Sequence, residues 1–210
     1  MKKLIVLLFL SIGYLYGFTQ ELPLKKDPAF QEGEVLNYKL KYGFITAAEA
    51  TIKVLPSTLK FDEKPTYRLV VDARTSGTFD VFYKIRDHYD SYIDKTNLTP
   101  YFYQENIREA SYRRTDKARF YQDTKKVVAN RGTFATPTTQ TFDLVSAYYF
   151  SRSLDISKLK IGDEFFGSHG DAAEGHVHEE YAYKVVGIAA PSGKVVDNLI
   201  LCTIPSVWQM

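Results

Sequence analysis

Apolar and polar residues alternate between positions 34 and 54, and few folds accommodate this pattern. The odd positions are mostly polar, and most of the apolar residues lie at even positions, among them Leu36, Tyr38, Leu40, Tyr42, Ala48, Ala50, Ile52 and Val54. Successive side chains of a β-strand point to opposite faces of a sheet, so a period of two predicts strands with one face on a core. Gly43 lies between the two halves and predicts a turn or bulge between antiparallel strands.

The same period recurs further along the chain. Tyr67–Ala73 places its apolar residues on one face, and the high content of Tyr and Phe (16 and 14 residues) also favours sheet. Further strands are predicted at Val81–Ile85, His88–Ile93, Thr99–Gln104, Ala118–Gln122, Lys126–Ala129 and Tyr181–Ile188. The segment Pro56–Pro65 is interpreted as a polar loop. Strands about a dozen residues apart are typical of a meandering sheet.

One segment, Asp143–Arg152, has a different period. Its apolar positions recur at helical spacing, and Asp143 is a suitable N-cap residue. We predict one short helix that packs on the sheet through the face carrying Leu144, Ala147, Tyr148 and Ser151.

The N-terminus has the layout of a secretory signal peptide. Lys2 and Lys3 precede an apolar run from Leu4 to Tyr16, and polar residues follow at once. The run is shorter than the roughly 20 residues that a membrane-spanning helix needs. We expect residues 1–19 to be removed by cleavage after Gly17 or Thr19, leaving a protein of the periplasm or cell envelope of a Gram-negative-type bacterium with no transmembrane span.

The rest of the chain suits one β-rich domain, residues 30–190, followed by a tail, residues 191–210. Its single cysteine, Cys202, excludes an internal disulfide and does not lie where a lipoprotein signal would place it. A formal net charge of +2 argues against a nucleic-acid partner.

Three segments in order resemble an uncharacterised family of exported bacterial domains: Glu32–Val54 (EGEVLNYKLKYGFITAAEATIKV), Phe82–Tyr103 (FYKIRDHYDSYIDKTNLTPYFY) and Phe142–Phe165 (FDLVSAYYFSRSLDISKLKIGDEF). That family is similar to the periplasmic lipoprotein-carrier (LolA/LolB-like) superfamily. The resemblance implies a mainly β fold, in which a strongly curved antiparallel sheet, open or a half barrel, packs around one short helix. The tail, residues 191–210, does not match the family's ending, so we expect an atypical or truncated C-terminal part.

The resemblance also implies an apolar cavity between sheet and helix. A lipid or the acyl tail of a lipoprotein is the expected ligand, with no enzymatic activity. The residues expected to line the cavity are Tyr38, Leu40, Tyr42, Ile52, Leu69, Val71, Leu144 and Tyr148. Ordinary core packing explains the same residues equally well. A further alternative is a structural role with an envelope protein partner at an open sheet edge.

Three of the four histidines, His169, His176 and His178, lie close together in the chain. His176 and His178 would project from the same face of a strand, as ligands of a divalent metal must. The alternative function is therefore a metal-binding protein or a metal-dependent hydrolase. A solvated hairpin tip that binds nothing explains the same residues.

Two other groups of charged residues have a simpler interpretation. Asp87, Asp90 and Asp94 lie near His88, and paired carboxylates can act on a glycan, but surface ion pairing explains them as well. A basic stretch suits either anionic lipid headgroups or the solvated face of a hairpin: Arg108, Arg113, Arg114, Lys117, Arg119, Lys125, Lys126 and Arg131. No motif of a nucleotide-binding loop or of a nucleophilic hydrolase is present.

Overall fold

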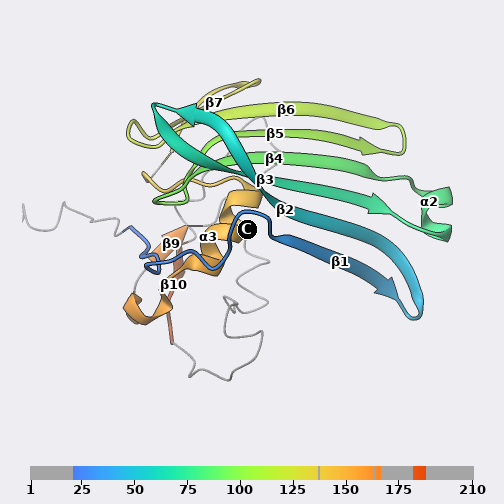
Figure 1. Ribbon diagram of the computed structural model, residues 1–210, viewed down its shortest axis with the longest axis horizontal. Helices are drawn as coiled ribbons and strands as arrows, with labels where there is room; N and C mark the ends of the chain where they lie inside the picture. The colour runs from blue at the N-terminus through green and yellow to red at the C-terminus, as the bar shows by residue number, and fades with distance from the viewer. Residues whose placement is uncertain (1–20, 137, 163, 167–181, 188–210) are drawn as a thin grey trace, which may run out of the picture.

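The computed structural model describes residues 21–136, 138–162, 164–166 and 182–187. Within these residues, eight strands form one sheet in which every strand pairs antiparallel with its neighbours in the chain (Figure 1). The strands are β1 (Val35–Tyr42), β2 (Ile45–Phe61), β3 (Lys64–Thr75), β4 (Arg86–Asp94), β5 (Pro100–Glu109), β6 (Tyr112–Tyr121), β7 (Lys126–Ala129) and β8 (Gly132–Ala135). The sheet does not close, so β1 and β8 are its edges.

The β2–β3 hairpin is longer than the sequence pattern indicates. The expected loop over Pro56–Pro65 is wrong, because β2 runs on to Phe61. Its register shifts between Pro56 and Lys60, which accommodates a residue without a backbone N–H. Asp62 and Glu63 turn the chain with φ of 52° and 61°, as a two-residue type I′ turn requires.

The strand predicted at Val81–Ile85 is also wrong. Thr78–Phe82 forms the short helix α2 at one end of the sheet. The Asp80 carboxylate in its first turn accepts hydrogen bonds from the Thr75 hydroxyl (2.7 Å) and the Arg86 guanidinium (2.6 Å). These bonds tie α2 to the end of β3 and the start of β4, an arrangement that alternation within one segment does not reveal.

The one short helix that the sequence predicts is confirmed as α3 (Leu144–Ser153). Asp143 caps it by accepting from the backbone N–H groups of Val145 and Ser146, both at 2.9 Å. The Ser146 hydroxyl in turn accepts from the Asp143 N–H, which completes a capping box.

The prediction of which helix face is buried is wrong. Leu144 is 77% exposed, whereas the opposite face packs on the sheet. The buried helix residues are Val145, Ser146, Tyr149, Phe150 and Ser153. Two serines belong to this face because their hydroxyls have partners: Ser146 bonds to Asp143, and Ser153 accepts from the Ala29 N–H.

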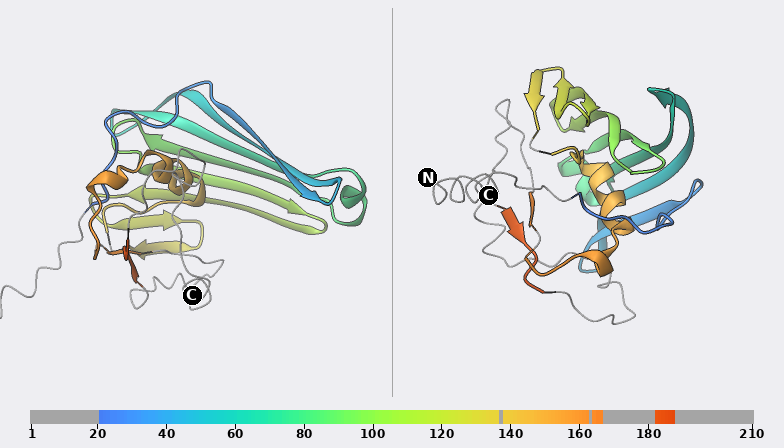
Figure 2. Two further views of the ribbon diagram at one scale, coloured as in Figure 1. Left: turned by 90° about the horizontal axis from the view of Figure 1, so that it is seen from below. Right: turned by 90° about the vertical axis from the view of Figure 1, so that its left-hand side faces the viewer.

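The sheet curves around α3, which lies on its concave side (Figure 2). The mainly β fold, with a curved, open antiparallel sheet packed around a short helix, is therefore confirmed. The core joins fully buried strand residues, Val54, Leu69 and Ile93, to Tyr149 and Phe150 of the helix. Each such aliphatic side chain contributes roughly 1.5–3 kcal/mol on burial.

The segment that precedes β1 packs against the core and is bound to α3. Leu22 and Leu24 pack against it, and the Arg152 guanidinium binds Glu34 ahead of β1 through two hydrogen bonds of 2.6 and 2.8 Å. A 3₁₀ turn, η1 (Ile156–Lys158), follows α3. A separate two-stranded sheet is formed by β9 (Glu164–Phe166) and β10 (Ala182–Lys184).

Candidate functional site

The concave face of the sheet, here called the inner face, is only partly covered by α3. The helix contacts β3 and β4 at one end, while the strands continue well past it towards α2 (Figures 1 and 2). The register of β1–β3 brings apolar residues together along this continuation: Leu36, Tyr38, Leu40, Ala48, Ala50, Ile52, Val71 and Ala73. We call this strip the apolar groove. The name refers to side-chain size, because Ala48, Ala50 and Ala73 are small and lie between larger neighbours in the register.

Two tyrosines connect the helix to the edge strand where the groove begins. The hydroxyls of Tyr38 on β1 and Tyr148 on α3 are 2.7 Å apart. Burial and this hydrogen bond raise the pKa of Tyr148 to about 12. Tyr148 also lies beside the Arg152 guanidinium, which is 5.6 Å from its ring centre. The pair therefore forms a polar bridge over one end of an apolar surface.

The inner face becomes polar on β4–β6. Glu105 is buried, accepts a hydrogen bond from the Tyr103 hydroxyl (2.7 Å) and forms an ion pair with Arg114. Tyr89 lies opposite Glu105 in the register, and burial together with the charge of Asp87 raises its pKa to about 12. The inner face thus has an apolar side and a side with charges and hydroxyls.

The structure divides the eight residues predicted to line a cavity into several groups. Leu69 is fully buried, and Ile52 and Val71 pack against the core beside it.

The other five predicted residues lie nearer the surface. Tyr38 and Tyr148 bridge β1 and α3. Leu40 and Tyr42 are 67% and 78% exposed, towards the far end of β1. Leu144 is 77% exposed on the outward side of α3, so the structure does not place it with the other residues predicted to line a cavity. The polar residues Tyr89, Tyr103 and Glu105 were missed, although their alternation with Asp90 and Gln104 is visible in the sequence.

The opposite, outer face carries a hydrogen-bonded network centred on His88. Its Nδ1 lies 2.7 Å from Asp72 Oδ1, and its Nε2 lies 2.9 Å from Asp90 Oδ2. Asp90 is 1% exposed and also accepts from Arg68 (2.6 Å) and Gln104 (3.1 Å). Burial opposes ionisation of Asp90, but these donors outweigh it and lower its pKa.

The three acids singled out in the sequence have separate structural roles. Asp87 accepts from the Arg108 N–H at 2.9 Å, and Asp90 belongs to the His88 network. Asp94 accepts from the Thr96 N–H and the Tyr101 hydroxyl, both at 2.6 Å, and so shapes the β4–β5 turn. All three carboxylates are already occupied by donors.

A shallow polar depression adjoins the His88 network on β2–β5. It has a volume of about 560 Å³, and Lys53, Asp72, Arg74, His88, Asn106 and Arg108 are among its lining residues. Its charges are largely paired: Lys53 with Asp72 (3.6 Å) and Arg74 with Glu49 (2.8 Å). These charged side chains are therefore engaged with one another in the depression.

The predicted metal ligands, His169, His176 and His178, lie outside the described residues, as does the tail at 191–210. Within the part of the chain that is described, no group of three His, Cys, Asp or Glu side chains could hold a metal ion. In that same part, no helix has both the length and the apolar character needed to cross a membrane. The hypotheses of metal binding and of an envelope protein partner stay predictions.

Comparison with known proteins gives one match. The family model described as "Protein of unknown function (DUF3108)" matches residues 37–190, which span β1–β8, α3 and the β9–β10 pair. No curated protein and no solved structure is significantly similar to the chain.

Proposed function

Since the chain belongs to the DUF3108 family, whose function is unknown, we propose a function from its geometry: a non-enzymatic envelope protein that binds an amphipathic lipid in the apolar groove. The signal-like segment at residues 1–19 supports export to the periplasm. We assign a binding function because the buried carboxylate of Glu105 on the inner face already has partners in Tyr103 and Arg114.

One observation carries the proposal: the apolar face of the sheet continues past the helix that covers it. A continuous apolar surface that the described residues leave uncovered is typical of an interaction site. Ala50 faces Tyr38 on one side and Ala73 on the other, so the floor there is low and flanked by a larger ring. An acyl chain can lie along such a strip with its length parallel to the strands.

The polar side of the inner face suits the other end of an amphipathic ligand. Tyr89 lies on β4 and Arg114 on β6, next to the apolar side on β1–β3. Tyrosine hydroxyls and a guanidinium are donors to phosphate or carboxylate oxygens. A lipid or lipoprotein tail therefore fits this face better than a uniformly apolar molecule does.

The test is the lipid content of the protein purified from bacterial envelopes. Native mass spectrometry and solvent extraction should find an acyl-chain lipid in the wild-type protein. Ala50→Phe should abolish or strongly reduce it, because the new ring fills the floor of the groove.

Thr51→Phe is the matched control. Thr51 is the next residue of β2 and faces Asn37, to which its hydroxyl bonds at 3.0 Å on the outer face. This variant should retain lipid at the wild-type level. Wild-type protein that carries no lipid and takes none up from lipid micelles would refute the proposal.

The alternative of a divalent metal site rests on the sequence spacing of His169, His176 and His178. Elemental analysis of the purified protein tests it directly. Metal that is lost in the double variant His176→Ala and His178→Ala, and retained in His88→Ala, would support it. Wild-type protein free of metal after incubation with zinc would reject it.

A further inference from the structure

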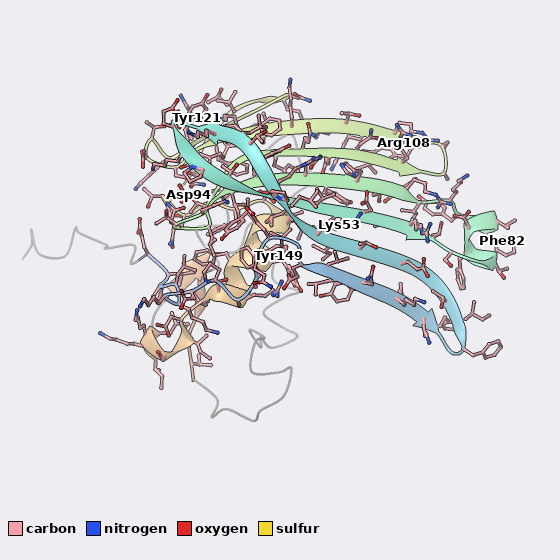
Figure 3. All side chains as sticks on the ribbon, viewed as in Figure 1. Lys53, Phe82, Asp94, Arg108, Tyr121 and Tyr149 are labelled. Atoms are coloured by element: carbon pink, nitrogen blue, oxygen red, sulfur yellow. The ribbon has the colours of Figure 1, made fainter. Side chains whose placement is uncertain are left out.

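The end of the sheet farthest from α3 exposes a group of large apolar side chains, here called the apolar tip. Four of them are more than three-quarters exposed: Tyr42 (78%), Phe44 (95%), Val81 (84%) and Phe82 (81%). They come from the β1–β2 turn and from α2. Phe82 projects from the end of the molecule in Figure 3. Tyr83 and Tyr112, each 49% exposed, flank the group.

The backbone that presents these side chains is well connected. The Ser76 N–H donates to the Ala47 carbonyl at 3.0 Å, which fastens the segment before α2 to β2. The Ala110 N–H donates to the Lys84 carbonyl at 2.8 Å, which fastens the segment after α2 to the β5–β6 turn. The tip therefore consists of three neighbouring segments joined by backbone hydrogen bonds. Its apolar side chains point outward from this connected backbone.

Positive charge surrounds the tip. Residues 39–49, 74–86 and 107–114 together contain eight Lys and Arg and three acids, whereas the formal net charge of the whole chain is only +2. One of the eight, Arg114, forms an ion pair with Glu105 outside these ranges, which still leaves the tip with an excess of positive charge. Two of the acids are neutralised locally: Asp80 by Arg86 at 2.6 Å, and Glu49 by Arg74 at 2.8 Å. Within the described part of the chain, Lys41 and Lys84 have no carboxylate within ion-pair distance. A net positive field therefore surrounds the exposed aromatic rings.

We propose that the apolar tip is a docking surface for an anionic lipid bilayer. Phenylalanine and valine side chains at the end of a ridge can enter the acyl boundary, while tyrosines at its flanks suit the headgroup level. Lysines beside them are attracted to anionic headgroups. The charge excess favours this occupant over a protein surface of mixed charge. The inference concerns a different surface from the apolar groove and does not depend on a ligand there.

Flotation of the mature protein with lipid vesicles tests the proposal. The wild type should bind vesicles of phosphatidylcholine with phosphatidylglycerol, bind those of phosphatidylcholine alone more weakly, and be released from the anionic ones by salt. The double variant Phe44→Ser and Phe82→Ser should lower the partition coefficient about tenfold or more, because two exposed rings no longer enter the bilayer. Lys41→Glu with Lys84→Glu should remove the preference for the anionic vesicles.

The matched controls lie at the opposite end of β2, near the β2–β3 turn. Leu59→Ser replaces a residue that is 50% exposed on β2, and Lys64→Glu reverses an exposed charge at the start of β3. Both should bind as the wild type does.

A Trp reporter supplies a measurement that does not require loss of binding. Phe82→Trp should show a blue-shifted emission with anionic vesicles and quenching by brominated lipid, whereas Leu59→Trp should show neither. Failure of wild-type flotation, equal losses in tip and control variants, or an unshifted Phe82→Trp emission would each overturn the proposal.

Discussion

His88 lies between two carboxylates, Asp72 and Asp90, while Lys53 and Arg68 bind the far sides of these acids. Burial opposes protonation of the imidazole, but the hydrogen bonds to both carboxylates outweigh it and raise the pKa of His88 above its ordinary value of 6.5. A group whose pKa is raised in the folded state favours folding most when it is protonated. Its contribution is complete below 6.5 and is lost as pH rises through the folded-state pKa.

We predict that His88→Gln removes this pH dependence. Urea unfolding of both proteins at a series of pH values is the measurement. The stability advantage of the wild type over the variant should be largest in mildly acidic buffer and should decline as the pH rises above 6.5. Two stability profiles that run parallel across this range would contradict the linkage.

Leu144 and Val145 are neighbours with opposite environments, 77% and 5% exposed. We predict that Leu144→Asp changes the free energy of unfolding by about 0.5 kcal/mol or less, since the new carboxylate stays in water at a helix N-terminus. Val145→Asp should cost several kcal/mol, because it buries an unpaired charge. Thermal unfolding followed by circular dichroism distinguishes them, and equal melting temperatures would show that the helix does not pack as described.

At the scale of elements, Asp143 connects α3 to the middle of the sheet. It caps the helix through Val145 and Ser146, and its Oδ2 accepts from the buried Ser91 hydroxyl of β4 at 2.8 Å. Burial raises the pKa of Asp143, although the hydrogen bonds from Ser146 and Ser91 oppose this. Asp143 therefore both caps α3 and joins the helix to β4.

We predict that Asp143→Ala lowers the free energy of unfolding by about 2 kcal/mol, the upper part of the range for a lost N-cap. Asp143→Asn should retain most of the stability, because the amide oxygen still accepts from the helix N–H groups. Chemical denaturation measures both changes. An alanine variant as stable as the asparagine variant would mean that the capping bonds contribute little.

The existence of α3 and of most strands could be predicted because period and capping are local signals, whereas β8 and β9 were missed. The boundaries that failed depend on partners that lie outside the segment itself, in the neighbouring elements. Asp80 is held in α2 by Thr75 and Arg86, and β2 continues past Pro56 because β3 pairs with it. The buried face of α3 was predicted on the wrong side because an apolar pattern does not identify Ser146 and Ser153 as buried. Both can be buried because their hydroxyls form hydrogen bonds.

For the whole molecule, the alternation identified the inner face of β1 and β2 but not where the helix lies on it. That position decides which of the predicted residues are core, as Leu69 is, and which remain at the groove, as Tyr38 does. The apolar tip was also beyond local patterns, because its side chains come from separate turns that the sheet brings together.

The export hypothesis belongs to this scale as well. We predict that protein recovered from the bacterial envelope begins after Gly17 or Thr19, because Lys2, Lys3 and the apolar run have the layout of a signal peptide. N-terminal sequencing provides the measurement. Lys2→Glu with Lys3→Glu should slow removal of the segment, whereas envelope protein that begins at Met1 would exclude cleavage.

The pairing of every strand of the sheet with its chain neighbours also affects how the protein is made. An exported chain emerges N-terminus first, so the β1–β2 hairpin is complete early, and each later strand meets an edge that already exists. Because each loop between paired strands is short, its closure costs little conformational entropy, and this favours rapid folding of the sheet. The helix that covers the inner face is made only after β8. Nascent chains therefore pass through a stage with an uncovered apolar sheet, and at that stage protection by chaperones is most needed.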